Sequence, residues 1–192
     1  MSPKSRYEKE EIVDAAFEIA REEGFSAITA RGVADRLGCS VAPIYVNFET
    51  IDDLTEAVVQ RVFALSQEML AGQQGPSAFE NIGRASLAFA REYPVLCREL
   101  ILSPNPYLAS YETVEAAVIG SMAEDPSMRD WTLEERRRLF LKMRAFQIGL
   151  TAMLANGYVP SWIDSQELEE LLMEVGSDLL EIETNKREAE TL

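Results

Sequence analysis

The sequence contains no histidine and only two cysteines among its 192 residues. Without histidine the chain cannot build a histidine-based catalytic triad or the histidine-containing zinc and di-iron sites of many enzymes. Cys39 and Cys97 lie far apart without a C-x-x-C spacing, so neither a disulfide framework nor a zinc knuckle is expected. A carboxylate-based hydrolase is the remaining enzyme alternative, but no paired acids stand out on an apolar face. We therefore expect no metal, no cofactor and no enzymatic activity.

Long apolar runs and basic residues are also scarce. No segment reaches the roughly 18 uninterrupted apolar residues of a membrane span, and the N-terminus lacks the apolar region of a signal peptide. These absences indicate a cytoplasmic protein without membrane association. Eighteen Lys and Arg against 33 Asp and Glu give a net charge of −15, which repels nucleic acid over most of the surface. Any contact with DNA must be local.

Apolar residues recur at helical spacing along the whole chain, and no segment alternates as a strand does. The hydrophobic content of 47% is enough for a sizeable core. The pattern predicts an all-α protein. The helices are expected at about residues 8–23, 30–37, 41–47, 50–70, 77–93, 94–103, 106–121 and 132–157 and from 164 onward.

Two short helices near the N-terminus are closely flanked by start and stop signals. Thr29 is a good N-cap, Gly38 ends the segment after about two turns, and Ser40 is the next N-cap. Two short helices joined by such a turn form a helix-turn-helix, which lays its second helix in the major groove of DNA. The same spacing also fits a plain three-helix core that binds no ligand.

The segment from Thr29 to Leu54 follows one specific pattern, T-x-R-x-V-A-x-x-L-G-x-S-x-x-x-x-Y-x-x-F-x(5)-L. The matching residues are Thr29, Arg31, Val33, Ala34, Leu37, Gly38, Ser40, Tyr45, Phe48 and Leu54. With the preceding helix that ends in EEGF, this segment resembles the tetracycline-repressor (TetR) family of bacterial regulators over about residues 8–60. The resemblance implies a homodimer whose N-terminal domain binds a palindromic operator. It also implies a helical C-terminal domain whose small-molecule ligand typically releases the DNA.

The resemblance also implies which residues contact DNA. Base or groove contacts would come from the third helix, and phosphate contacts from Tyr45, Arg31 and the helix start at Thr29. The N-terminal arm with Lys4 and Arg6 either enters the adjacent minor groove or forms a disordered tail. The complete set of implied DNA-binding residues is Lys4, Arg6, Thr29, Arg31, Ser40, Val41, Ala42, Pro43, Tyr45, Val46 and Asn47.

Two positions depart from the family pattern. Ile51 stands where the family usually has a lysine, and Asn47 stands where a histidine is usual. One phosphate contact is therefore missing, although Asn47 can pair with adenine. Residues 1–49 carry six basic and nine acidic residues, so we expect weak nonspecific DNA binding with strong salt sensitivity.

The C-terminal part is expected to form a larger helical domain. We divide the chain into a DNA-binding domain, residues 1–49, and a regulatory and dimerisation domain, residues 50–192, in which residues 50–71 form the connecting helix. The last two helices should pair with a second copy as a four-helix bundle. The residues expected to line an apolar effector pocket, which equally suit core packing, are Phe89, Tyr93, Cys97, Tyr107, Tyr111, Met143, Phe146, Gln147 and Leu150.

The sequence thus predicts a ligand-responsive transcription regulator, a repressor that binds its operator as a homodimer and is released by an apolar or amphipathic effector. The alternative is a protein of the same fold that has lost operator binding and acts through protein contacts. Ile51 and the acidic composition support this alternative.

Overall fold

The computed structural model describes residues 7–75, 77–106 and 111–191, and in these ranges the chain forms helices and no strand, as predicted. Three short helical segments, η1 (Phe25–Ala27), η2 (Arg98–Leu102) and η4 (Pro126–Met128), connect the longer helices. The α-helices are α1 (Lys9–Glu23), α2 (Ala30–Leu37), α3 (Ala42–Asn47), α4 (Ile51–Ala71), α5 (Ala78–Glu92), α6 (Pro94–Cys97), α7 (Tyr111–Met122), α8 (Leu133–Ala155) and α9 (Ser165–Thr191).

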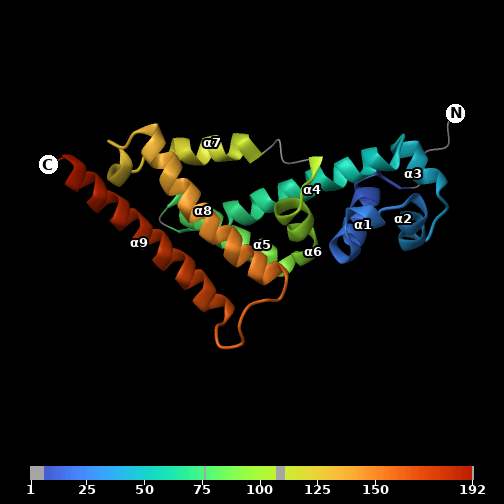
Figure 1. Ribbon diagram of the computed structural model, residues 1–192. Coiled ribbons are helices and arrows are strands. Elements are labelled where there is room, and N and C mark those ends of the chain that lie inside the picture. Colours follow the sequence, from blue (N-terminus) through green and yellow to red (C-terminus); the bar gives the residue numbers. More distant parts are fainter. Residues whose placement is uncertain (1–6, 76, 107–110, 192) are drawn as a thin grey trace.

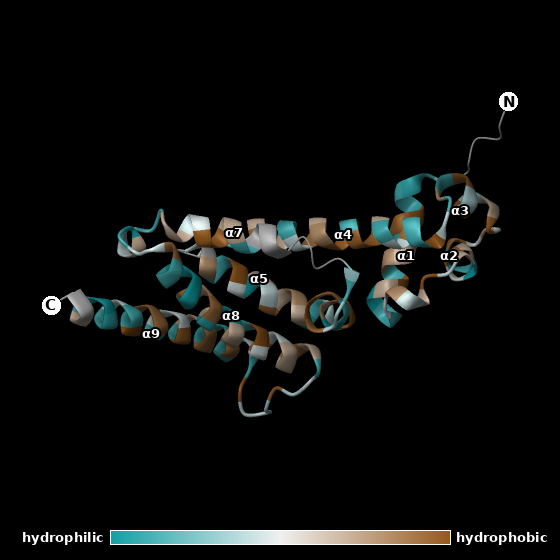
Figure 2. Ribbon diagram, turned by 45° about the horizontal axis from the view of Figure 1, so that its top comes forward, coloured by the Kyte–Doolittle hydropathy of each residue, from teal (hydrophilic) through white to brown (hydrophobic). Residues whose placement is uncertain are grey.

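The molecule is elongated, with α1, α2 and α3 grouped at one end (Figure 1). Helix α4 leaves this group and runs along α5 into the second group of helices. Helices α8 and α9 pack side by side as an antiparallel hairpin, as their short connection predicts. Along α4 and α9 hydrophilic and hydrophobic segments alternate, as expected for helices with one buried face (Figure 2).

Hydroxyl side chains cap several of the helices. Thr50 and Asp53 form a reciprocal capping box at the start of α4, and Thr132 and Glu135 form another at the start of α8. The side chain of Ser77 accepts a hydrogen bond from the Glu80 N–H at the start of α5. These caps satisfy backbone donors that a helix cannot pair internally.

Three local predictions need correction. Ser40 is not the N-cap of α3, because Val41 holds that position in a helical conformation (φ −70°, ψ −14°) and no side chain caps the helix. The predicted helix at 94–103 is one α-turn followed by the π-helical turn η2. The final residues, whose polar sequence suggests fraying, continue α9 to Thr191.

A single buried cluster joins the N-terminal helices to the second group. Ile12, Val33 and Ile44 are buried together with Val58 of α4. The same cluster includes the buried side chains of Phe89, Tyr93, Leu96 and Cys97 from α5 and α6. The boundary predicted between residues 49 and 50 falls at the N-cap of α4, and the apolar core continues across it.

A carboxylate of the second group also binds the end of α1. The Phe25 N–H donates a hydrogen bond to Glu99 Oε2 at 2.8 Å. Gly24, which ends α1 with φ 96°, lies so close to this carboxylate that any side chain at position 24 would collide with it. The neighbouring Arg98 donates to the carbonyl of Ala155 at the end of α8. The turn η2 therefore connects the ends of α1 and α8.

None of the helices in the described ranges is both long enough and apolar enough to span a membrane.

Candidate nucleic-acid interface

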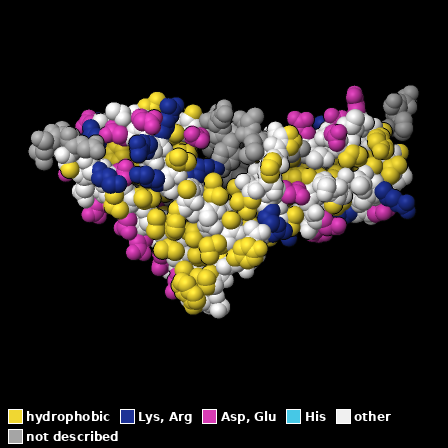
Figure 3. Space-filling view, viewed as in Figure 1, with side chains coloured by type: hydrophobic (Ala, Val, Ile, Leu, Met, Phe, Trp, Pro, Cys, Tyr) yellow, Lys and Arg dark blue, Asp and Glu magenta, His cyan; other side chains and the backbone are white. Residues whose placement is uncertain are grey.

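Helix α3 has one buried and one exposed face. Ile44 and Phe48, four residues apart, are 1% and 4% exposed and anchor the helix to the core. On the other face Val41, Tyr45 and Val46 are 41%, 55% and 69% exposed. A helix of six residues cannot hold itself in water, so the two anchors determine which face points outward. Figure 3 shows hydrophobic side chains gathered at this end of the molecule.

The turn before α3 is held from several sides. Gly38 ends α2 in the left-handed conformation (φ 66°), and the Cys39 N–H donates to the Ala34 carbonyl at 3.0 Å. The Tyr7 hydroxyl donates to the carbonyl of Leu37 at 3.1 Å. These bonds fix the angle at which α3 leaves α2, which a helix-turn-helix requires.

The predicted phosphate-binding residues lie on exposed surface. Thr29 Oγ1 accepts a hydrogen bond from the Gly32 N–H at 3.0 Å, so the start of α2 is ordered. The side chain of Arg31 is 90% exposed, and its ion pair with Asp35 is loose, with an N–O distance of 3.9 Å. Such an exposed pair stabilises the fold little, so its guanidinium can turn to a phosphate at small cost.

Asn47 is less available than its neighbours. Its side-chain Nδ2 donates to the carbonyl of Pro43 at 2.9 Å, and the residue is half-buried. A bidentate contact with adenine requires the amide to give up this bond and rotate outward. The side chains that already point outward on this helix are Val41, Ala42, Tyr45 and Val46.

The charge of this region differs from that of the whole chain. Residues 30–48 hold two arginines against one aspartate, a net charge of +1, whereas the whole chain carries −15. Arg36 forms a two-pronged pair with Glu22, with N–O distances of 2.7 and 3.1 Å. These hydrogen bonds lower the pKa of Glu22 and raise that of Arg36. The acidic end of α1 is thereby partly neutralised beside α2.

The other predicted DNA-contact positions are placed as follows. Ser40 is exposed just before α3, and Pro43 is half-buried in the first turn of α3. Lys4 and Arg6 lie outside the described residues. Ile51, at the usual lysine position, is half-buried and packs against the core, so it contributes packing at the start of α4.

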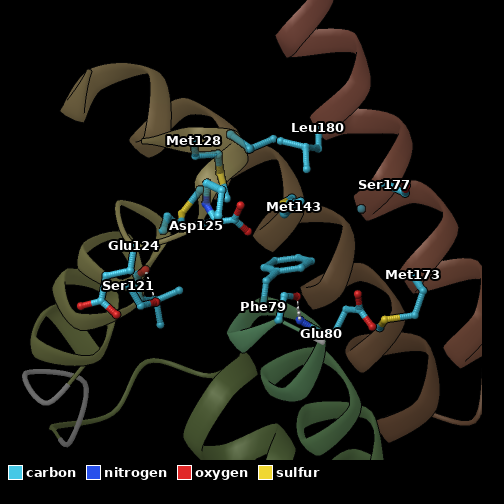
Figure 4. A pocket seen from close by; sticks show the side chains of 16 residues that line it. Phe79, Glu80, Ser121, Glu124, Asp125, Met128, Met143, Met173, Ser177 and Leu180 are labelled. Atoms are coloured by element: carbon cyan, nitrogen blue, oxygen red, sulfur yellow. Dashed lines mark hydrogen bonds between the residues drawn. The ribbon is translucent and has the colours of Figure 1, made fainter. Parts of the chain in front are cut away.

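A separate cavity lies in the second group of helices, between α5, α7, α8 and α9 (Figure 4). It has a volume of about 540 Å³. Figure 4 shows the ring of Phe79 and the side chains of Met143 and Leu180 within it. The sixteen lining residues include Met122, Met128, Met143, Met173, Phe79, Leu180, Glu80, Glu124 and Asp125.

The predicted effector residues are distributed over several places. Met143 lines the cavity. Phe89, Tyr93 and Cys97 belong to the first core cluster, where burial raises the pKa of Tyr93 and raises that of Cys97 to about 11. Phe146 and Leu150 pack in another apolar cluster, and Gln147 is buried. Tyr107 lies outside the described residues, and Tyr111 is the first residue of α7.

Sequence reasoning missed most of the cavity wall. Phe79 and Met173 lie on α5 and α9, about ninety residues apart in the chain, and only folding brings them together. One signal was available, because four of the seven methionines line this cavity. Methionine is the side chain that best fills irregular gaps and adaptable binding surfaces.

The final hairpin exposes apolar side chains along its outer side. Leu141 of α8 is 66% exposed and Ile182 of α9 is 48% exposed. Ala145 and Ile148 continue the stripe from Leu141 along α8, and each is at least partly exposed. Figure 3 shows hydrophobic side chains over α8 and the loop after it, with acidic side chains along the edge formed by α9.

The protein is all-α and contains a helix-turn-helix, which is defined by two short helices, a turn held at Gly38 and an outward face on α3. Residues 12–58 match the family model of the bacterial regulatory proteins of the tetR family. This stretch of the chain is therefore similar in sequence to that family, as the residues from Thr29 to Leu54 predict.

One solved structure shows the same fold over nearly the whole chain. A TetR-like transcriptional regulator from Rhodococcus sp. RHA1 is 19% identical, with a TM-score of 0.63 covering 92% of this chain and 96% of that chain. A probable transcriptional regulatory protein is 17% identical, with a TM-score of 0.48 over 91% of this chain and 97% of that chain. No curated protein matches the chain in sequence.

Proposed function

We propose that the protein is a ligand-responsive repressor that binds a palindromic operator as a homodimer. The observation that carries the proposal is the outward face of α3, where the large side chains of Val41, Tyr45 and Val46 are all exposed to solvent. Apolar side chains on such a helix can contact thymine methyl groups, and a tyrosine hydroxyl can donate to a phosphate. The proposal implies a cytoplasmic protein, because it acts on the chromosome.

The proposed DNA contacts come from α3, from the start of α2 and from the N-terminal arm. The side chains of α3 would read the groove, and Arg31, Tyr45 and the backbone at the start of α2 would bind phosphates. The local charge of residues 30–48 supports this arrangement, since a segment of net charge +1 can approach DNA in a chain of −15. Lys4 and Arg6 remain proposed minor-groove contacts.

A dimer is proposed because one helix-turn-helix reads only half of a palindrome. Two copies must hold their third helices about 34–36 Å apart to enter successive major grooves. The apolar stripe of α8 and the exposed Ile182 of α9 are the surfaces proposed to pair, as a four-helix bundle. We retain the division into residues 1–49 for DNA binding and residues 50–192 for regulation and pairing.

Release by an effector is proposed to act through the cavity and the shared core. A ligand shifts an equilibrium only when it binds two conformations unequally. Helices α5 and α8 line the cavity, α5 packs on α4, and η2 joins the ends of α1 and α8. A change in the packing around the cavity therefore has a direct physical route to the DNA-binding helices.

The alternative function is a protein of this fold that acts only through protein contacts. The specific observation in its favour is Ile51, which packs into the core at a position where a lysine would bind phosphate. Under this alternative the outward face of α3 would be a protein-binding surface.

A selection from a random DNA library with the purified full-length chain distinguishes the two functions. We expect enrichment of a palindrome, and we expect its affinity to fall steeply with salt. Val46→Glu should abolish binding, because the new carboxylate would face the DNA, while Tyr158→Glu on the exposed loop after α8 serves as the matched control. If no palindrome is enriched at low salt, the protein-contact alternative holds.

A further inference from the structure

The walls of the cavity between α5, α7, α8 and α9 are soft and apolar. Four methionines and Phe79 contribute to them, together with Leu139 and Leu180. Methionine side chains are polarisable and adopt many conformations, so they can close around ligands of different shapes. Gly176 of α9 adds room, since a side chain there would lie only 3.3 Å from the ring of Phe79. These walls suit a hydrocarbon or aromatic body.

The charged groups on the same cavity have one sign. Glu80, Glu124 and Asp125 line it, and no lysine or arginine is among its described lining residues. Two hydrogen bonds from Ser127, at 2.8 and 2.6 Å, both use Oδ1 of Asp125 and hold this carboxylate in place. Glu80 approaches Arg84 only at 4.0 Å, so its carboxylate is weakly compensated. Together with the net charge of −15, these groups favour a positive ligand and repel an anion.

The positive ligand that suits this site is organic. In the described part of the chain no group of three or more acidic or cysteine side chains is close enough to hold a metal ion. An ammonium group with apolar substituents meets carboxylates on the rim, methionines on the walls and the face of an aromatic ring, which attracts cations within about 6 Å.

We infer that this cavity binds an organic cation, an ammonium group on an apolar body, as the effector of the protein. This inference rests on the proposed function only in calling the bound cation an effector. Binding itself is a property of the cavity and can be measured without DNA.

The chain provides its own reporter for this binding. Trp131 is buried in the same apolar cluster as Met128 and Met143, which line the cavity. The other tryptophan, Trp162, is 78% exposed on the loop after α8. In the Trp162→Phe variant the tryptophan fluorescence therefore comes from Trp131 alone, next to the cavity.

The test is a titration of Trp162→Phe with three probes that share an eight-carbon chain: octyltrimethylammonium and octanoate, each below its micelle concentration, and octanol below its solubility limit. We expect saturable quenching with one octyltrimethylammonium per chain. Octanol and octanoate should bind at least about tenfold more weakly than the cation. Of the three affinities, only that for the cation should fall with added salt. Equal affinity for the cation and octanol, or no binding of the cation, overturns the inference.

Two variants in this background locate the site, and a third serves as the control. Glu80→Gln with Asp125→Asn removes two charges, keeps the shapes of both side chains, and should weaken octyltrimethylammonium binding about tenfold while leaving octanol unchanged. Phe79→Leu should also weaken the cation selectively. Glu115→Gln, an exposed acid of α7 that does not line the cavity, is the control. Unchanged binding in the double variant overturns the inference even if the cation binds.

The operator experiment separates this inference from the proposed function. If the cation binds with the expected selectivity but no palindrome is selected, the cavity assignment is supported and the repressor function is refuted. A selected palindrome without cation binding refutes the cavity assignment and leaves the repressor in place. If both hold, octyltrimethylammonium should release the operator, and the double variant should require about tenfold more of it.

Discussion

The two ends of the molecule treat apolar side chains in opposite ways. The N-terminal helices are small and tightly capped, and they expose Val41, Tyr45 and Val46 on one short helix while Ile44 and Phe48 anchor it. The second group encloses its soft side chains, including four methionines, around a cavity of about 540 Å³. Under the proposed function, the first arrangement presents a fixed surface to duplex DNA, and the second can adapt its interior to a small molecule. Substitutions matched between the two faces or the two groups test this contrast.

The largest expected effect concerns the two faces of α3. Ile44→Ala should lower the free energy of unfolding by about 2–5 kcal/mol, because it empties a fully buried site. Val46→Ala, two residues away and 69% exposed, should leave stability within about 0.5 kcal/mol of the parent and reduce operator affinity. Urea unfolding and a mobility-shift titration measure the two quantities. Equal stability loss in both variants would mean that α3 has no free outer face.

A smaller effect is expected where the two groups meet. Glu99→Ala removes the acceptor of the Phe25 N–H and should cost about 1–3 kcal/mol. Glu99→Gln keeps an oxygen in nearly the same place and should recover much of this loss. Glu56→Ala, an exposed acid of α4, provides the control for loss of a charge. Identical unfolding curves for Glu99→Ala and the control would show that this hydrogen bond does not hold the groups together.

Two threonines of α8 should respond in opposite directions. Thr151 is 1% exposed, and its hydroxyl has no hydrogen-bond partner among the described residues. Thr151→Val should therefore raise the free energy of unfolding by about 1 kcal/mol, since an unpaired buried hydroxyl is removed without change of shape. Thr132→Val, which removes the cap of the same helix, should lower it by about 1 kcal/mol. Thermal unfolding should show a higher midpoint for the first variant and a lower one for the second.

The two cysteines offer a test that hardly perturbs the molecule. Cys39 lies in the turn between α2 and α3 and is partly exposed, whereas Cys97 is buried with its pKa raised to about 11. At pH 8 only about one Cys97 thiol in a thousand is ionised, so iodoacetamide should label Cys39 alone. Operator DNA should then slow the labelling of Cys39. Mass spectrometry that found Cys97 labelled first would contradict the burial of α6.

Several helix starts follow closely from local signals in the sequence. Thr29, Thr50 and Thr132 stand where caps are needed, and each caps a helix in the structure. Ser40 shows the limit of this reasoning, because a serine before a helix caps it only if the backbone turns at that residue. Val41 already has helical dihedral angles, so the helix starts without a side-chain cap.

The lining of the cavity in the second group could not be predicted from local sequence signals. The residues predicted to line a pocket share apolar character, but helical periodicity does not tell which neighbouring helix each one meets. Cys97 therefore packs against the N-terminal helices, and Met143 against the cavity. The turn η2 was equally hidden, because its π-helical geometry depends on the contacts of Arg98 and Glu99 with distant backbone groups.

Helix α4 has 21 residues and begins three positions after the last residue anchoring α3, Phe48. It is about 31 Å long, so a tilt of about 10° at its far end moves its first turn by about 5 Å. This displacement is longer than any hydrogen bond. Under the proposed function, a modest tilt of α4 would therefore move both DNA-binding helices of the dimer out of register with the major grooves, although every helix keeps its structure.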